Sequence, residues 1–131
     1  MKNTIFKLLE YLYYFSLVIL LIIYLFPGSL IGYLLYGNIG QQPNLIPSPI
    51  GTSMNHLIYF SFITVLLIII RPKVKNIFTN YKIILFGSFT LEILHLIIPN
   101  RAFEFYDLIA NILGVAVVLF LKKFTKWSNF S

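Results

Sequence analysis

Ionisable and polar residues gather between positions 92 and 111, in a part of the chain that is otherwise apolar enough for a lipid bilayer. Ionisable side chains at membrane depth are costly and usually face the interior of a helix bundle, so they indicate a functional site. Carboxylates, imidazoles and a guanidinium can bind an anionic group, exchange protons or hold a metal ion. The residues are Glu92, His95, Arg101, Glu104, Asp107 and Asn111, together with His56 from an earlier segment.

The composition indicates an integral membrane protein. Of 131 residues, 59% are hydrophobic and 11% are charged, whereas soluble domains carry about 25% charged residues. The net charge of +6 does not indicate nucleic-acid binding, because Lys and Arg stand at the ends of apolar segments. There they set topology and contact anionic membrane lipid. The absence of Cys excludes disulfides and thiolate chemistry.

Four apolar segments predict an all-α, polytopic fold with four transmembrane helices in one integral membrane domain, residues 1–131. A helix rises about 1.5 Å per residue, so about 20 residues cross the hydrocarbon core. A basic start before an apolar run can also be a secretory signal, but Pro27-Gly28-Ser29 offers no small-residue cleavage site. The predicted helices cover about 5–26, 54–70, 81–98 and 105–121.

Glycine and proline separate the predicted helices. Pro27-Gly28 ends the first helix, because proline cannot continue the hydrogen-bond ladder, and Pro99 ends the third. Residues 30–36 are apolar but too short to cross, which predicts an interfacial or re-entrant segment. Residues 37–51 are uncharged and rich in Gly and Pro, so they predict a loop.

The basic residues predict that both termini are cytoplasmic. Positively charged loops stay on the cytoplasmic side of a membrane. Nine of the ten Lys and Arg residues lie in the N-terminus, the 71–82 connection and the C-terminal tail, and four spans place all three clusters inside. An odd number of spans would place one cluster outside. The nine are Lys2, Lys7, Arg71, Lys73, Lys75, Lys82, Lys122, Lys123 and Lys126.

Helical spacing predicts that two polar stripes face each other. Residues three and four apart share a helix face, and small residues such as Ala110 and Gly114 allow close helix approach in membranes. One stripe is Tyr81, Leu85, Ser88, Glu92 and His95, and the other is Asp107, Asn111, Gly114 and Val118.

These groups are expected near the external side, under the uncharged loop. His56 opens the second predicted helix at that side, and the short connection between the last two helices contains Arg101. Arg101 is therefore the expected counter-ion for Glu92, Glu104 or Asp107.

The residues alone leave several uses of this cluster open. The carboxylates and Arg101 could form a structural clasp, or make the chain a structural partner in a membrane complex. Alternatively, Arg101, Asp107 and Asn111 bind the headgroup of an amphiphile. As a membrane-embedded hydrolase or transferase, the protein would use Glu92 as acid or base with His95 or His56 as its partner.

A metal site is the weakest of these interpretations. Imidazole and carboxylate groups ligate metals, and His56, His95, Glu92 and Asp107 supply them. The two histidines are far apart in the sequence, however, and the expectation is no metal and no cofactor. Neither a G-x-S-x-G motif nor a Cys nucleophile supports catalysis, so headgroup binding is the preferred interpretation.

The same residues resemble the VanZ-like family of small bacterial membrane proteins, which is named after a protein linked to teicoplanin resistance. The resemblance covers about residues 52–121. His95 stands where the family usually has Gln, and Thr52-Ser53 stand where it often has an acid and Lys. The matching residues are Asn55, His56, Phe60, Glu92, Pro99, Arg101, Asp107, Asn111 and Gly114.

The resemblance implies a multi-pass protein of the bacterial plasma membrane, acting in the cell envelope. It further implies glycopeptide (teicoplanin) resistance, with a lipid-linked cell-wall component or the glycopeptide itself as partner.

Overall fold

The computed structural model describes residues 2–44, 46–47 and 51–125, and the described chain is all-helical. This confirms the predicted all-α class. The short helix α2 falls in the segment that is too short to cross a membrane. The elements are α1 (Lys2–Leu25), α2 (Leu30–Tyr36), α3 (Gly51–Ile70), the 3-10 turn η1 (Ile77–Thr79), α4 (Tyr81–Leu94) and α5 (Phe105–Phe124).

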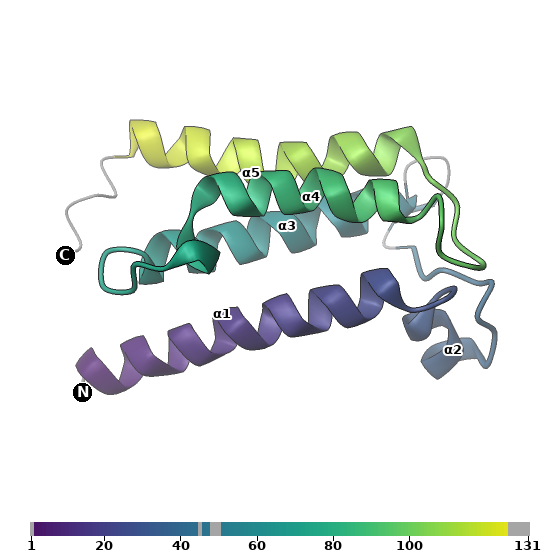
Figure 1. Cartoon of the computed structure of the whole chain (residues 1–131), viewed down its shortest axis with the longest axis horizontal. Coiled ribbons are helices and arrows are strands. Elements are labelled where there is room, and N and C mark those ends of the chain that lie inside the picture. The colour runs from purple at the N-terminus through teal and green to yellow at the C-terminus, as the bar shows by residue number, and fades with distance from the viewer. Residues whose placement is uncertain (1, 45, 48–50, 126–131) are drawn as a thin grey trace.

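The four longer helices run lengthwise in one bundle, with α2 at one end and η1 at the other (Figure 1). The most extensive contacts are between α3 and α5, while α1 packs mainly on α3. At Gly114 of α5, a Cβ atom would lie 2.6 Å from the Leu57 carbonyl oxygen of α3. Only glycine therefore permits this approach, and Gly114 packs against α3 rather than against the neighbouring polar helix α4.

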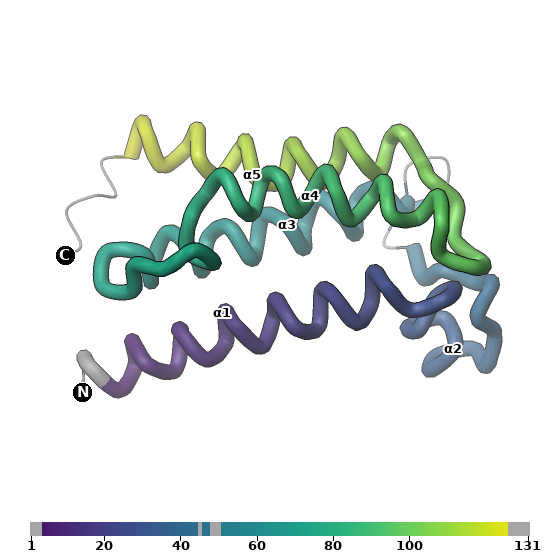
Figure 2. The backbone as a smooth tube through the Cα atoms, in the orientation of Figure 1, coloured from purple at the N-terminus to yellow at the C-terminus, as the bar shows by residue number. Residues whose placement is uncertain are grey.

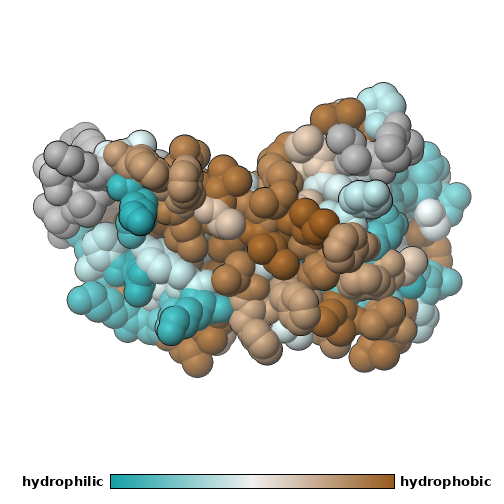
Figure 3. Space-filling view, turned by 90° about the horizontal axis from the view of Figure 1, so that it is seen from above, coloured by the Kyte–Doolittle hydropathy of each residue, from teal (hydrophilic) through white to brown (hydrophobic). Residues whose placement is uncertain are grey.

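The face of the bundle seen in Figure 3 is apolar over its middle and more polar toward its ends. Aromatic and aliphatic side chains such as Leu8, Phe15, Phe86 and Phe120 are more than half exposed. Water would penalise such a surface, whereas lipid tails accept it. In the described chain, three helices are long and apolar enough to cross a membrane, namely Thr4–Leu25, Gly51–Ile70 and Phe105–Phe124.

Helix α4 is shorter than predicted, since it ends at Leu94 rather than at 98. The backbone tightens after that point, and the N–H groups of His95, Leu96 and Ile97 bond to carbonyls three residues earlier. Continued α-helix would press the Pro99 ring against the His95 carbonyl, four residues before it. With 14 residues, α4 rises only about 21 Å.

The other helix limits differ less from the predicted ones. Helix α3 begins at Gly51, three residues earlier than predicted, so Ser53 belongs to its first turn. A Cβ atom at Gly51 would meet the Ile46 carbonyl oxygen at 2.1 Å, which requires glycine there. Helix α5 continues to Phe124 and includes Lys122 and Lys123, while Lys126 lies outside the described residues.

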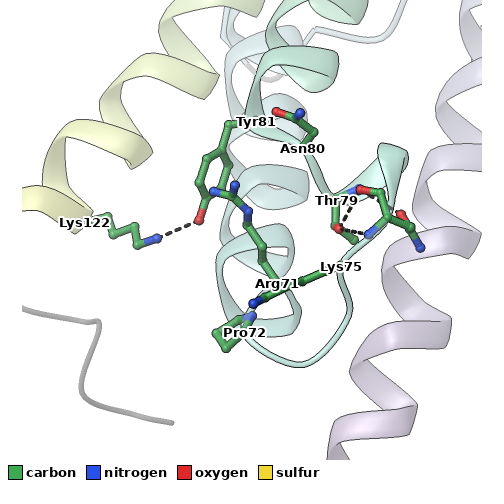
Figure 4. Close-up of a pocket in the computed structure, with 8 residues that line it drawn as sticks. Arg71, Pro72, Lys75, Thr79, Asn80, Tyr81 and Lys122 are labelled. Carbon is green, nitrogen blue, oxygen red and sulfur yellow. Dashed lines mark hydrogen bonds between the residues drawn. The ribbon is translucent and has the colours of Figure 1, made fainter.

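Basic side chains from the connection after α3 and from the end of α5 lie at the η1 end of the bundle. The Arg71 guanidinium lies 3.9 Å from the centre of the Tyr81 ring, and Lys122 Nζ donates to the Tyr81 hydroxyl at 2.6 Å (Figure 4). Lys73 Nζ lies 4.6 Å from the centre of the Phe6 ring of α1. A cavity of about 460 Å³ opens here between Arg71, Lys75 and Lys122.

Candidate functional site

Polar side chains from four helices meet at the opposite end, where α2 and the 37–44 loop lie. Glu92 and Asn111 are fully buried, and His95 and Asp107 are each 4% exposed. The side chain of His56 is 13% exposed. The structure therefore brings together the sequence-predicted residues His56, Glu92, His95, Asp107 and Asn111.

Glu92 lies in the last turn of α4, yet the segment that follows folds over it. Its Oε1 is 3.2 Å from His95 Nδ1 and accepts the backbone N–H of Glu104 at 3.2 Å. Its Oε2 accepts a long hydrogen bond of 3.5 Å from Asn111 Nδ2. The 95–104 segment, which begins where the predicted helix was expected to continue, therefore supplies two contacts to this carboxylate.

Asp107 lies in the first turn of α5 and is held by two residues of α3. Its Oδ1 accepts a hydrogen bond from Ser53 Oγ at 2.5 Å. Its Oδ2 lies 3.5 Å from His56 Nε2. Ser53 and His56 are three residues apart, so they share one face of α3.

His56 is oriented by Tyr24 and Asn111. Its Nδ1 is 2.6 Å from the Tyr24 hydroxyl and 3.1 Å from Asn111 Oδ1. Tyr24 stacks on the His95 ring, with 5.1 Å between ring centres, and meets the His56 ring edge-on. Tyr24 therefore lies between the two histidines of the chain.

The hydrogen-bond partners favour one proton position on His56. Asn111 Nδ2 donates to the Ser88 carbonyl at 3.2 Å, so its Oδ1 must face Tyr24 and His56. An amide oxygen only accepts, and the Tyr24 hydroxyl donates its own proton to it at 2.8 Å. With the Tyr24 hydroxyl donating to Asn111, a proton on His56 Nδ1 completes these hydrogen bonds, and Nε2 is the atom that faces Asp107.

Arg101 does not form the ion pair expected from the sequence. Its Nε donates to the Phe26 carbonyl at 3.3 Å and its second terminal nitrogen to the Ile23 carbonyl at 2.5 Å. Figure 2 shows the end of α1 beside the 95–104 connection. Carbonyls at a helix C-terminus lack intrahelical partners and attract cations. Burial lowers the Arg101 pKa, while Tyr24, Glu92 and Asp107 oppose that shift.

Glu104 contributes its backbone rather than its carboxylate. Its side chain is exposed, and its backbone N–H donates the hydrogen bond to Glu92. Partial burial raises the pKa of the Glu104 carboxyl, and the negative charges of Asp107 and Glu92 add to the shift. In the described part of the chain, the ion pairs of Glu92 and Asp107 are with histidine alone.

Two cavities adjoin this cluster. A small cavity of about 140 Å³, called the polar cavity for the groups of Tyr24, His56 and Arg101 that line it, also has apolar walls from residues such as Leu20 and Ile23. A larger apolar groove of about 510 Å³ lies between α1 and α4. Leu20 lines both, so the polar cavity and the apolar groove meet at this side chain.

Tyr24 and Ser53 are site residues that the sequence did not single out. Tyr24 is one of nine tyrosines, and in an aromatic-rich chain its position at the end of α1 does not distinguish it. Ser53 could have been found from its spacing, because it precedes His56 by three residues. The predicted helix, however, begins at residue 54, one residue after Ser53.

Comparison with known proteins gives no match to a protein family, to a characterised protein or to a solved structure.

Proposed function

We propose that this chain is a multi-pass protein of the bacterial plasma membrane that binds an anionic amphiphile from the outer leaflet. The polar group would occupy the cavity beside His56 and Arg101, and the apolar tail would lie in the groove between α1 and α4. One observation carries this proposal: Leu20 lines both cavities, so the cavity beside the polar cluster adjoins the apolar groove.

Arg101 supplies the positive charge of the polar cavity. A guanidinium has five N–H donors, so the two bonds to the end of α1 leave donors for a further partner. Guanidinium geometry suits phosphate and carboxylate groups. Because Arg101 is bound to neutral carbonyls rather than paired with Glu92, its positive charge remains available to the amphiphile.

The apolar groove suits a hydrocarbon chain. Leu17, Leu21, Phe60, Ile84 and Leu91 line it, and its size is within the range of ligand sites. Gly87 also lines the groove, and a Cβ atom at Gly87 would meet no atom within 4 Å. The groove can therefore be filled by substitution at this position without disturbing the packing around it.

The proposed topology has four spans with both termini in the cytoplasm. The basic residues at the η1 end support this orientation, because they would face the cytoplasm while the polar site faces outward. Short α4 would cross as a helix extended by the 95–98 turns. The VanZ-like resemblance adds that the amphiphile would be a lipid-linked cell-wall component or a glycopeptide. Its binding would alter teicoplanin susceptibility.

Teicoplanin and vancomycin susceptibility of a sensitive bacterial host tests this proposal. The host expresses the parent chain, Gly87→Leu, which fills the groove, or Ala116→Leu, which adds the same side chain on the exposed face of α5. We expect protection from the parent and from Ala116→Leu but not from equally abundant Gly87→Leu. No protection by the parent, or equal protection by all three, would overturn the proposal.

An enzyme is the second candidate, because two buried histidine–carboxylate pairs are suited to proton transfer. His95 Nδ1 lies 3.2 Å from Glu92 Oε1, and His56 Nε2 lies 3.5 Å from Asp107 Oδ2. The purified chain would be incubated with bacterial envelope lipids and the products followed by mass spectrometry. A hydrolase or transferase predicts turnover that Glu92→Gln abolishes, whereas a binding protein predicts no new product.

A further inference from the structure

His56, Glu92 and Asp107 bring three potential metal ligands together from three helices. Each offers one ligand atom, and these atoms lie within 4.8 Å of one another. We infer that the three residues form a site for one divalent transition-metal ion. This inference stands on the geometry of the cluster and does not depend on the amphiphile proposed above.

The spacing of the ligand atoms is close to that of a metal site. Nitrogen and oxygen ligands lie about 2.0 to 2.2 Å from Zn²⁺, so tetrahedral ligands lie about 3.3 to 3.6 Å from each other. His56 Nε2 and Asp107 Oδ2 are 3.5 Å apart. This separation is long for a hydrogen bond but fits two ligands of one ion. Glu92 is the third potential ligand, with its ligand atom within 4.8 Å of the others. Its Oε2 lies 3.9 Å from His56 Nδ1, so the Glu92 side chain must turn toward Nε2 to complete the site.

The tautomer of His56 with its proton on Nδ1 leaves Nε2 available as a metal ligand. A proton on Nδ1 is accepted by the Tyr24 hydroxyl and Asn111 Oδ1, which lie 2.6 and 3.1 Å away. In neutral imidazole the remaining nitrogen, Nε2, then carries a lone pair that points toward a carboxylate oxygen. Such a pair of acceptors is favourable only with a cation between them. Metal-bound histidines typically donate their other N–H in this manner.

The carboxylates are oriented in the same way. Glu92 Oε1 is held by His95 and by the Glu104 N–H, and Asp107 Oδ1 is held by Ser53. Asp107 Oδ2 faces His56 Nε2, whereas Glu92 Oε2 lies nearest to His56 Nδ1 and accepts a long hydrogen bond from Asn111 Nδ2. Outer hydrogen bonds of this kind fix the direction of metal ligands.

The charge of the cluster also favours a cation. Glu92 is fully buried and Asp107 is 4% exposed, and in the described chain their ion-pair partners are histidines. Two ionised carboxylates buried without a full counter-charge are unfavourable. A divalent ion supplies two positive charges at one point.

The ligand set indicates which metals fit. Imidazole combined with carboxylates suits Zn²⁺ and Mn²⁺, whereas Mg²⁺ and Ca²⁺ prefer oxygen ligands alone. Three protein ligands leave a coordination position open, as in catalytic rather than structural zinc sites. His56 lines the polar cavity, so that position would be reached from the cavity.

Binding of Zn²⁺ to the full-length chain tests the inference. The protein is purified in detergent without a polyhistidine tag, treated with chelator and titrated calorimetrically. We expect one ion per chain, and a loss of at least tenfold in affinity in His56→Ala and Asp107→Asn. Glu104→Gln, which removes an exposed carboxylate nearby, should bind as the parent does. No binding by the parent, or unchanged binding in His56→Ala, would overturn the metal site. The cluster would then be held together by protons shared between His56 and the carboxylates.

Cobalt substitution keeps the inference testable if those variants fail to fold. The chain has no Cys, so His56→Cys introduces its only thiol. A thiolate is a strong metal ligand, and Co²⁺ bound to it absorbs in the near ultraviolet by sulfur-to-metal charge transfer. We expect this band in His56→Cys but not in Ala102→Cys, whose thiol lies in the exposed connection. A folded His56→Cys protein without the band would overturn the site.

Discussion

Tyr24 of α1 donates its hydroxyl proton to Asn111 Oδ1 of α5 at 2.8 Å, and so joins the first and last helices inside the bundle. The same hydroxyl lies 2.6 Å from His56 Nδ1 of α3. Because Asn111 also donates to the Ser88 carbonyl of α4, one tyrosine and one asparagine connect all four long helices. The orientation of His56 therefore depends on contacts that span the whole sequence.

We predict that Tyr24→Phe destabilises the protein by about 0.6 to 2 kcal/mol, because a buried acceptor and a buried imidazole each lose a partner. Thermal unfolding in detergent measures the change. Tyr11→Phe is the matched control, since Tyr11 lies on the same helix and is 71% exposed. Equal melting temperatures for the two variants would show that the Tyr24 hydroxyl does not hold the bundle together.

We predict opposite effects for the same substitution at two helix glycines. Gly114→Ala places a Cβ atom 2.6 Å from the Leu57 carbonyl, so α3 and α5 must separate, at a cost of about 1 to 3 kcal/mol. Gly87→Ala meets nothing within 4 Å and should be neutral or stabilising, because alanine favours a helix interior by up to about 1 kcal/mol. Unfolding midpoints of both proteins test this, and a stable Gly114→Ala variant would contradict the packing.

The sequence predicts most of the buried cluster because helical spacing is a local property. Glu92 and His95 are three residues apart, as required for one face of a helix, and Asp107 and Asn111 are four apart. Both pairs become buried together. The all-α class follows equally well from long apolar runs with proline and glycine between them.

Spacing cannot show which of several polar partners an arginine selects. Arg101 was expected to pair with a carboxylate, but the end of α1 presents bare carbonyls at Ile23 and Phe26 within its reach. That proximity depends on how α1 packs against the rest of the bundle, which no local pattern contains. Tyr24 was missed for the same reason. The early end of α4 depends on backbone geometry before Pro99 that the hydropathy of the segment does not reveal.

We predict that Arg101→Lys destabilises the chain by about 1 to 3 kcal/mol although it preserves the charge. One ammonium cannot reproduce two diverging bonds to the Ile23 and Phe26 carbonyls. Thermal unfolding is the measurement, and Arg71→Lys at the other end is the comparison. If Arg101 acted only as a counter-ion for the buried carboxylates, Lys would replace it fully and the melting temperature would stay at the parent value.

The final prediction concerns whether α4 crosses the membrane. With four spans, the 71–80 connection lies in the cytoplasm and the 99–104 connection outside, whereas with three spans and α4 on one side both connections share a compartment. The chain has no Cys, so single cysteines report location without a background thiol. Lys75→Cys and Ala102→Cys both lie at exposed positions outside the long helices.

We expect a membrane-impermeant maleimide to label Ala102→Cys in intact cells, and to label Lys75→Cys only after the membrane is opened. Gln41→Cys, in the uncharged loop, should behave as Ala102→Cys does. A 14-residue helix is short for a bilayer about 30 Å thick, so the crossing requires the turns after Leu94 or local thinning of the membrane. Labelling of Lys75→Cys and Ala102→Cys under the same condition would show that α4 does not cross the membrane.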